Sequence, residues 1–179
     1  MCIRDRIDLF VKGYPDDERC GKLLVYKMAI LSRQGNSAQK ELEATHQRIH
    51  ANLRRYGGTA GLEADELLSH FYQRTGQLDS ALELYTRALQ ARRRMIADAE
   101  KDKSSLPSGF YRLHDHAALQ AGAICLEKKQ ATEAIKWLEN VRYDAELKTT
   151  AKLYMAKVYY DKQEYQRAID CLTERGFID

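Results

Sequence analysis

The chain has 179 residues, of which 44% are hydrophobic and 31% charged, with 10 Gly and 2 Pro. This composition is typical of a folded, helix-rich protein and excludes collagen-like and disordered classes. The 29 Lys and Arg residues against 26 Asp and Glu leave a formal charge of +3, too balanced for a dedicated nucleic-acid or polybasic membrane binder. Because no apolar run approaches the eighteen or so residues of a membrane helix, we expect no transmembrane segment.

The N-terminal third predicts short helices. Residues 1–6 resemble translated sequencing-adapter read-through, and this resemblance suggests that they are not native. Further along, helical spacing of apolar residues recurs over 7–11, 23–31 and 42–53, with Asp17 near an N-cap and Gly35 in a turn. The range 1–56 is therefore predicted to contain one or more degenerate helical hairpins.

The glycine-rich run Gly57–Gly61 predicts a flexible break before the next helical segment. Over 62–101, apolar residues at three-to-four spacing predict a helical hairpin with an extended second helix, and Gly76 supplies a residue that tolerates positive φ at the turn. Ser80-Ala81-Leu82-Glu83 has the form of a capping box, which would start the second helix near Asp79 or Ser80.

After a predicted loop over 102–110, the range 111–179 repeats itself. A shift of 34 residues places Gly122 on Ala156 and Ala134 on Ala168. Two helices approach closely only where neither presents a bulky side chain, so these small residues predict the crossing point of each hairpin. The range 111–179 is thus predicted to hold two hairpin repeats and to be truncated at its C-terminus, in a chain that is a piece of a longer protein.

The repeat resembles the tetratricopeptide repeat. The matching positions are Leu68-Ser69, Tyr72, Gly76, Ala81, Tyr85 and Ala88 in one copy, Ala121-Gly122, Cys125, Ala134, Leu138 and Val141 in the next, and Met155-Ala156, Tyr159, Ala168 and Leu172 in the last. The early Trp and the closing Pro of the family are missing, and Lys129 and Gln163 replace the turn glycine. The resemblance implies an all-α fold, a right-handed α-α superhelix built as a solenoid of hairpins.

The run Phe10–Asp17 resembles the inter-repeat joints of bacterial cell-envelope tetratricopeptide proteins, of the outer-membrane assembly lipoprotein and TolA-binding types. This weaker resemblance implies a bacterial parent protein and is compatible with a periplasmic or outer-membrane-associated location. A cytoplasmic location stays open, as does the oligomeric state.

The family resemblance implies a protein-protein interaction scaffold or adaptor that binds a peptide or partner protein in a concave groove. The residues that it places on the concave face are Glu63, Glu66, His70, Gln73, Arg74, His116, Leu119, Leu126, Leu153, Lys157, Tyr160 and Asp161. The Lys and Asn clamp of co-chaperone members is not reproduced, because Glu66 and His70 stand at those positions. A heat-shock co-chaperone is therefore disfavoured.

No motif predicts catalysis. Glycine-rich phosphate loops, dinucleotide fingerprints and nucleophile elbows are missing, so we expect a non-enzyme without a cofactor or a small-molecule substrate. His46 and His50 share one helix face, but Gln47 replaces the catalytic Glu of a zincin and no third ligand is identifiable. We therefore predict no metal site and no catalytic residues.

Two alternatives remain open. The basic run Arg92-Arg93-Arg94 would serve a regulatory or nucleic-acid-binding helical-repeat module, although an exposed triplet more often solubilises a helix. The chain would otherwise be an accessory region of a larger enzyme. We expect a protein or peptide partner rather than a nucleic acid.

Overall fold

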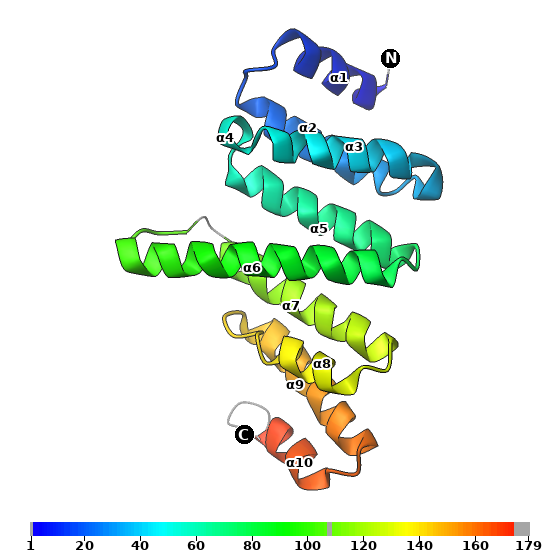
Figure 1. Ribbon diagram of the computed structural model, residues 1–179, viewed down its shortest axis with the longest axis vertical. Helices are drawn as coiled ribbons and strands as arrows, with labels where there is room; N and C mark the ends of the chain where they lie inside the picture. The colour runs from blue at the N-terminus through cyan, green and yellow to red at the C-terminus, as the bar shows by residue number, and fades with distance from the viewer. Residues whose placement is uncertain (1, 107–108, 174–179) are drawn as a thin grey trace. The chain divides into compact units, whose positions relative to one another are not determined.

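The structure is a computed structural model that describes residues 2–106 and 109–173 (Figure 1). Within these ranges the regular elements are all helical, which confirms the all-α prediction. The elements are α1 (Ile3–Gly13), α2 (Arg19–Leu31), the 3-10 helix η1 (Gly35–Ala38), α3 (Gln39–Ala51), α4 (Leu53–Tyr56), α5 (Gly58–Arg74), α6 (Leu78–Asp102), α7 (Phe110–Glu127), α8 (Ala131–Leu138), α9 (Ala145–Asp161) and α10 (Tyr165–Thr173). Every helix of the described ranges falls short of the length or the apolarity that crossing a bilayer requires.

The chain divides into two compact units, residues 1–84 and residues 85–179, with the boundary inside α6. Each unit has its own packing and is described by itself.

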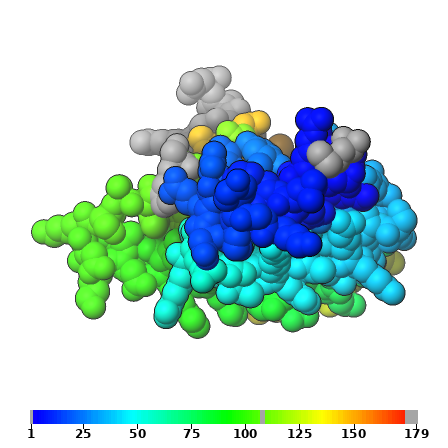
Figure 2. Space-filling model, turned by 90° about the horizontal axis from the view of Figure 1, so that it is seen from above, coloured from blue at the N-terminus to red at the C-terminus, as the bar shows by residue number. Residues whose placement is uncertain are grey.

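The first unit is held together by apolar side chains from α1 to α5. Met28 and Leu31 of α2, Ile49 of α3 and Phe71 of α5 are each at most 1% exposed and belong to one core cluster. These residues follow the three-to-four spacing of an amphipathic helix, so each helix turns its apolar face towards the others. Helix α1 packs on α2, and it forms the dark blue surface nearest the viewer in Figure 2.

A buried lysine ties the first three helices of this unit together. Lys27 of α2 is 7% exposed, and its Nζ lies 2.7 Å from Asp8 Oδ1 of α1 and 2.8 Å from Glu41 Oε1 of α3. A buried ammonium group is tolerated only where anionic partners replace its lost water. The two carboxylates meet that requirement from both neighbouring helices.

The glycine-rich stretch is helical, so the predicted flexible break over Gly57–Gly61 is wrong. Only Gly57, with φ of 81°, interrupts the helices, and α5 begins at Gly58. Gly61 serves close packing instead, because a Cβ atom at this position would lie 2.6 Å from Leu53 Cδ2. Gly61 therefore lets α4 and α5 approach one another.

The start of α6 also differs from the capping-box prediction. The helix begins at Leu78, and the amide of Ala81 already donates to the carbonyl of Gln77 at 3.0 Å. Ser80 therefore lies inside the first turn rather than at its N-cap. The predicted extended second helix of the range 62–101 is confirmed, since α6 continues to Asp102.

The second unit contains two antiparallel hairpins, α7 with α8 and α9 with α10 (Figure 1). In the first hairpin, a Cβ atom on Gly122 would lie 2.7 Å from Leu138 Cγ and 3.4 Å from the carbonyl oxygen of Ala134. The predicted crossing point is confirmed here, because the small residue of α7 sits directly against the small residue of α8. In the second hairpin, Ala156 and Ala168 are both buried.

The hairpin turns share one backbone geometry. Gly76, Lys129 and Gln163 have φ of 76°, 59° and 63°. The residue after each donates its amide to a carbonyl five residues back, as Gln130 does to Cys125 at 2.8 Å and Glu164 does to Tyr159 at 2.9 Å. This is the Schellman bond that ends a helix at a left-handed residue. The prediction of positive φ at Gly76 is confirmed, and Lys129 and Gln163 hold the same conformation with a side chain.

Replacing Gln163 by glycine should stabilise the second unit. The left-handed conformation costs a side-chain residue about 1–2 kcal/mol, of which the extra freedom of glycine in the unfolded chain cancels about half. We expect Gln163→Gly to raise the free energy of unfolding by about 0.5–1 kcal/mol in urea titrations followed by circular dichroism. The adjacent Lys162, with φ of −84°, is the matched control, and Lys162→Gly should lower it. Equal effects of the two substitutions would contradict the prediction.

Candidate functional site

One face of α9 presents the predicted partner-binding residues of this helix together. Leu153, Lys157, Tyr160 and Asp161 are all exposed, and their spacing of four, three and one residues places them along one side of the helix. We call these four residues the α9 stripe. Buried residues of the same helix are Ala151, Ala156, Val158 and Tyr159. The helix begins where Asp144 Oδ1 accepts the Leu147 amide at 3.0 Å.

The α9 stripe exposes large apolar groups beside charges. Leu153 is 47% exposed and Tyr160 is 64% exposed. The ring of Tyr160 lies edge-on to that of Tyr165, with centroids 5.6 Å apart, so the apolar surface continues from α9 onto α10. Lys157 lies one turn from both Leu153 and Tyr160, and Asp161 lies one turn beyond Lys157. The stripe therefore offers apolar contact together with one positive and one negative group.

Helix α7, which packs against α9 in the same unit, holds three more of the predicted residues. His116 and Leu126 are half-buried, and the His116 ring is 3.4 Å from the Gln120 amide nitrogen. Leu119 is only 6% exposed. Its side chain is therefore occupied by internal packing and offers almost no surface to a partner.

The remaining predicted residues lie on α5 of the first unit. Glu63, His70 and Arg74 are exposed, whereas Glu66 and Gln73 are half-buried. Their spacing follows one side of α5, and Arg74 Nη1 lies 3.5 Å from the carbonyl oxygen of Ser32 in the same unit. The predicted residues therefore lie on α5 in the first unit and on α7 and α9 in the second unit.

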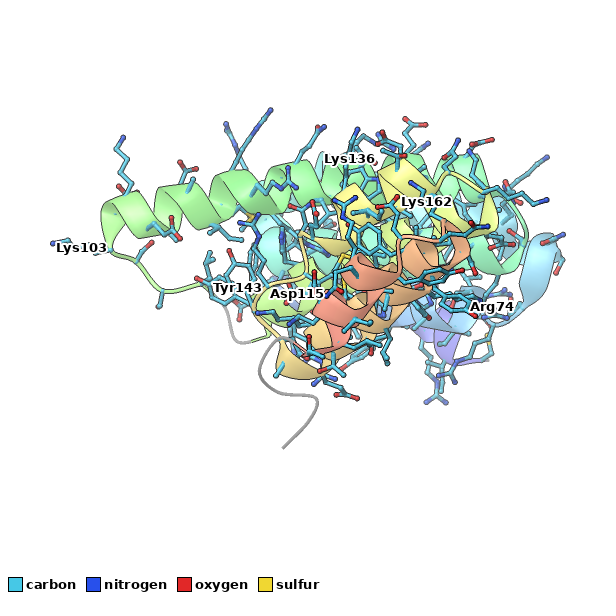
Figure 3. All side chains as sticks on the ribbon, turned by 90° about the horizontal axis from the view of Figure 1, so that it is seen from below. Arg74, Lys103, Asp115, Lys136, Tyr143 and Lys162 are labelled. Carbon is cyan, nitrogen blue, oxygen red and sulfur yellow. The ribbon has the colours of Figure 1, made fainter. Side chains whose placement is uncertain are left out.

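A buried carboxylate that sequence reasoning missed fixes the start of α9. Asp115 of α7 is 0% exposed, and it accepts the amides of Arg142 at 3.0 Å and of Tyr143 and Asp144 at 2.6 Å each. Asp115 and Tyr143 lie close together in Figure 3. Three consecutive amides converging on one carboxylate hold the loop before α9 against α7. The position of the α9 stripe therefore depends on Asp115.

The neighbouring His114 is buried in the same region. Burial lowers the pKa of His114, the charge of Asp115 acts in the opposite direction, and nearby arginines, Arg92 first among them, lower it further. The imidazole is therefore neutral at physiological pH, and its ring lies 5.8 Å from that of Tyr143. This residue belongs to the packing of the loop rather than to the exposed surface.

The basic run 92–94 is only partly available to a partner. Arg92 is 1% exposed, and its Nη1 donates to the carbonyl of Leu113 at 2.8 Å. Arg93 is exposed and donates to Asn140 Oδ1 at 2.6 Å. Glu100 lines the same open cleft of about 430 Å³ as Arg93. A buried guanidinium and a mixed-charge cleft do not form the continuous positive surface that phosphate binding needs.

Two histidines and an aspartate converge in the first unit. His46 and His50 of α3 each place Nε2 near Asp65 Oδ1 of α5, at 2.8 and 2.9 Å, and the two imidazole centroids are 4.4 Å apart. Burial raises the pKa of Asp65, but the hydrogen bonds and charges of the two histidines outweigh it and hold this pKa below its usual value. Sequence reasoning found the histidine pair and missed Asp65, because nothing along the chain relates a residue of α5 to that face of α3.

No family model matches the sequence, and no curated protein matches it significantly. Among solved structures, the chain is similar to the crystal structure of BtubC (BKLC) from P. vanneervenii, with 15% identity and a TM-score of 0.43. That alignment covers 94% of this chain and 84% of the other. The likeness is too distant to bear on function.

Proposed function

We propose that this protein is a tetratricopeptide-like helical-repeat scaffold, without enzymatic activity, that binds a peptide segment of a partner protein on the face formed by α7 and α9. The repeat assignment is supported by the shared turn geometry at Gly76, Lys129 and Gln163 and by the close crossing of Gly122 with Ala134. Hairpins of this kind stack into a right-handed superhelix that displays the first helix of each repeat.

The observation that carries the binding proposal is the α9 stripe. A helix that only completes a core buries its large apolar side chains and exposes polar ones. Helix α9 instead exposes Leu153 and Tyr160 on the side opposite to its buried residues. Exposed tyrosine is favourable at interfaces because its ring packs against apolar groups while its hydroxyl stays hydrated.

The expected ligand follows from the chemistry of the stripe. Apolar side chains of a peptide would pack on Leu153 and Tyr160, a carboxylate would pair with Lys157, and a donor would meet Asp161. These contacts resemble the mixed apolar and polar anchoring of peptides in grooves. The half-buried His116 and Leu126 would border the same peptide from α7, whereas Leu119 would not take part.

Selection of peptides from a random displayed library on the immobilised chain tests this function. The affinity of a selected peptide, measured by fluorescence polarisation, should fall about tenfold or more in Tyr160→Ala and in Lys157→Glu. The matched controls are Tyr26→Ala on α2, where the tyrosine is 52% exposed, and Lys148→Glu, which lies nine residues before Lys157 on the other side of α9. The proposal is wrong if affinity is unchanged in both stripe variants, or if the controls lose as much.

A further inference from the structure

We propose that His46, His50 and Asp65 form a binding site for a divalent transition-metal ion, specifically Zn²⁺, that links α3 to α5. The site lies wholly in the first unit and shares no residue with the α9 stripe. It therefore stands or falls separately from the proposed peptide binding.

The geometry brings the three ligand atoms together from two helices. His46 and His50 are four residues apart on α3, so their rings project from one face, and Asp65 faces them from α5. One potential ligand atom from each of the three residues lies within 4.8 Å of the other two. Within residues 2–106 and 109–173, this is where three potential metal ligands of the His, Cys, Asp and Glu types converge.

The spacing of these atoms is close to that of a zinc site. Zn²⁺ binds imidazole nitrogen and carboxylate oxygen at about 2.0–2.2 Å, so tetrahedral ligands are about 3.4 Å apart. The distances of 2.8 and 2.9 Å from Asp65 Oδ1 to the two Nε2 atoms therefore need to open by about half an ångström. Zinc binding therefore requires the Asp65 carboxylate and the two imidazole rings to move apart by that amount.

The charges also favour a cation. The Asp65 carboxylate faces the two imidazoles of His46 and His50 through a single oxygen, at 2.8 and 2.9 Å. Zinc would bind each Nε2 atom in place of its proton, and each neutral ring would then carry its proton on Nδ1. Two neutral imidazoles and one carboxylate then leave a net charge of +1 on the complex rather than an isolated buried dication.

The site is sheltered but accessible. The side chains of His46 and Asp65 are 13% and 16% exposed, whereas that of His50 is 34% exposed. The Nε2 atom of His50 is itself buried, so this ring would have to turn outward to admit an ion, and a water molecule would then complete the fourth position from the same side. Hard cations such as Mg²⁺ prefer oxygen ligands, so the histidine pair selects for zinc and similar metals.

Thermal unfolding of the metal-stripped 179-residue chain at pH about 7.5, followed by circular dichroism with and without ZnCl₂, tests the site. At free zinc about a hundred times the Kd, we expect the Tm to rise by about 5–10 °C. Competition with a chromophoric chelator should show that one zinc equivalent is lost in His50→Gln and in Asp65→Asn, and MgCl₂ should have no effect. Asp65→Asn retains an oxygen of the same size, so it preserves packing while removing the charged ligand.

His116→Gln on α7 is the matched control, and it should retain both the zinc equivalent and the rise in Tm. If one ligand variant does not fold, chelator competition on the other decides. The proposal is overturned if zinc does not raise the Tm of the unsubstituted chain, or if the folded ligand variants keep the same zinc equivalent and the same rise as His116→Gln.

Discussion

Asp115→Ala is expected to lower the free energy of unfolding by about 3 kcal/mol, because three backbone amides lose a charged acceptor at once. Each hydrogen bond to a charged group contributes about 1.5–3 kcal/mol, and water entering the space recovers part of the loss. The amides belong to Arg142, Tyr143 and Asp144, so their release also frees the first turn of α9. Urea titration followed by circular dichroism measures the change.

Two further substitutions separate this effect from a general loss of charge. Asp115→Asn keeps one acceptor oxygen and should lose less stability than the alanine variant. Asp98→Ala removes an exposed carboxylate from α6 and should change the free energy of unfolding by less than about 0.5 kcal/mol. If Asp115→Ala unfolds at the same urea concentration as Asp98→Ala, the carboxylate does not hold the loop. Asp115→Ala should also weaken peptide binding at Tyr160, since the loop that Asp115 holds positions α9.

The helices themselves could be predicted because their apolar residues repeat at the helical period. The spacing around Leu24, Met28 and Leu31 places them in one core stripe, and the structure buries all three. The crossing of Gly122 with Ala134 could be predicted for a similar reason, since the two positions are small in successive copies. Local pattern and repetition are enough to fix these features, because both act within one hairpin.

Glycine and serine each have more than one structural use, and the local sequence does not distinguish between these uses. Gly57–Gly61 was predicted to be a flexible break, but only Gly57 needs a positive φ, and Gly61 allows contact with Leu53. Ser80 fits a capping box and lies within the first turn of a helix that begins at Leu78. Which use applies depends on how closely a neighbouring helix packs against the residue, and the sequence does not reveal that distance.

The candidate sites show the same limit more strongly. Leu153, Lys157 and Tyr160 could be placed on one side of α9 because a helix fixes which residues share a face, and all three are exposed. Asp65 and Asp115 gave no signal, since an aspartate on a helix is usually solvated and their partners are contributed by other segments. The burial of Arg92 could not be predicted either, because the Leu113 carbonyl that accepts its hydrogen bond belongs to another helix.

Gly122→Leu is expected to lower the free energy of unfolding by about 3 kcal/mol, although leucine is the better helix former. The added Cβ would lie 2.7 Å from Leu138 Cγ, so the four new carbon atoms have no space between α7 and α8. Gly58→Leu is the matched control, because no atom lies within 4 Å of a Cβ at that position of α5. It should leave stability unchanged or raise it slightly.

A double substitution then identifies the contact that is responsible. Leu138→Ala alone creates a cavity and should cost about 2–5 kcal/mol, since Leu138 is 1% exposed. In the Gly122→Leu background, the space vacated by Leu138→Ala accepts the new side chain. The double variant should therefore lose less stability than the sum of the two single variants, by about 1 kcal/mol or more. Simple additivity would mean that α7 and α8 do not cross at these residues, and the hairpin assignment of the second unit would then be wrong.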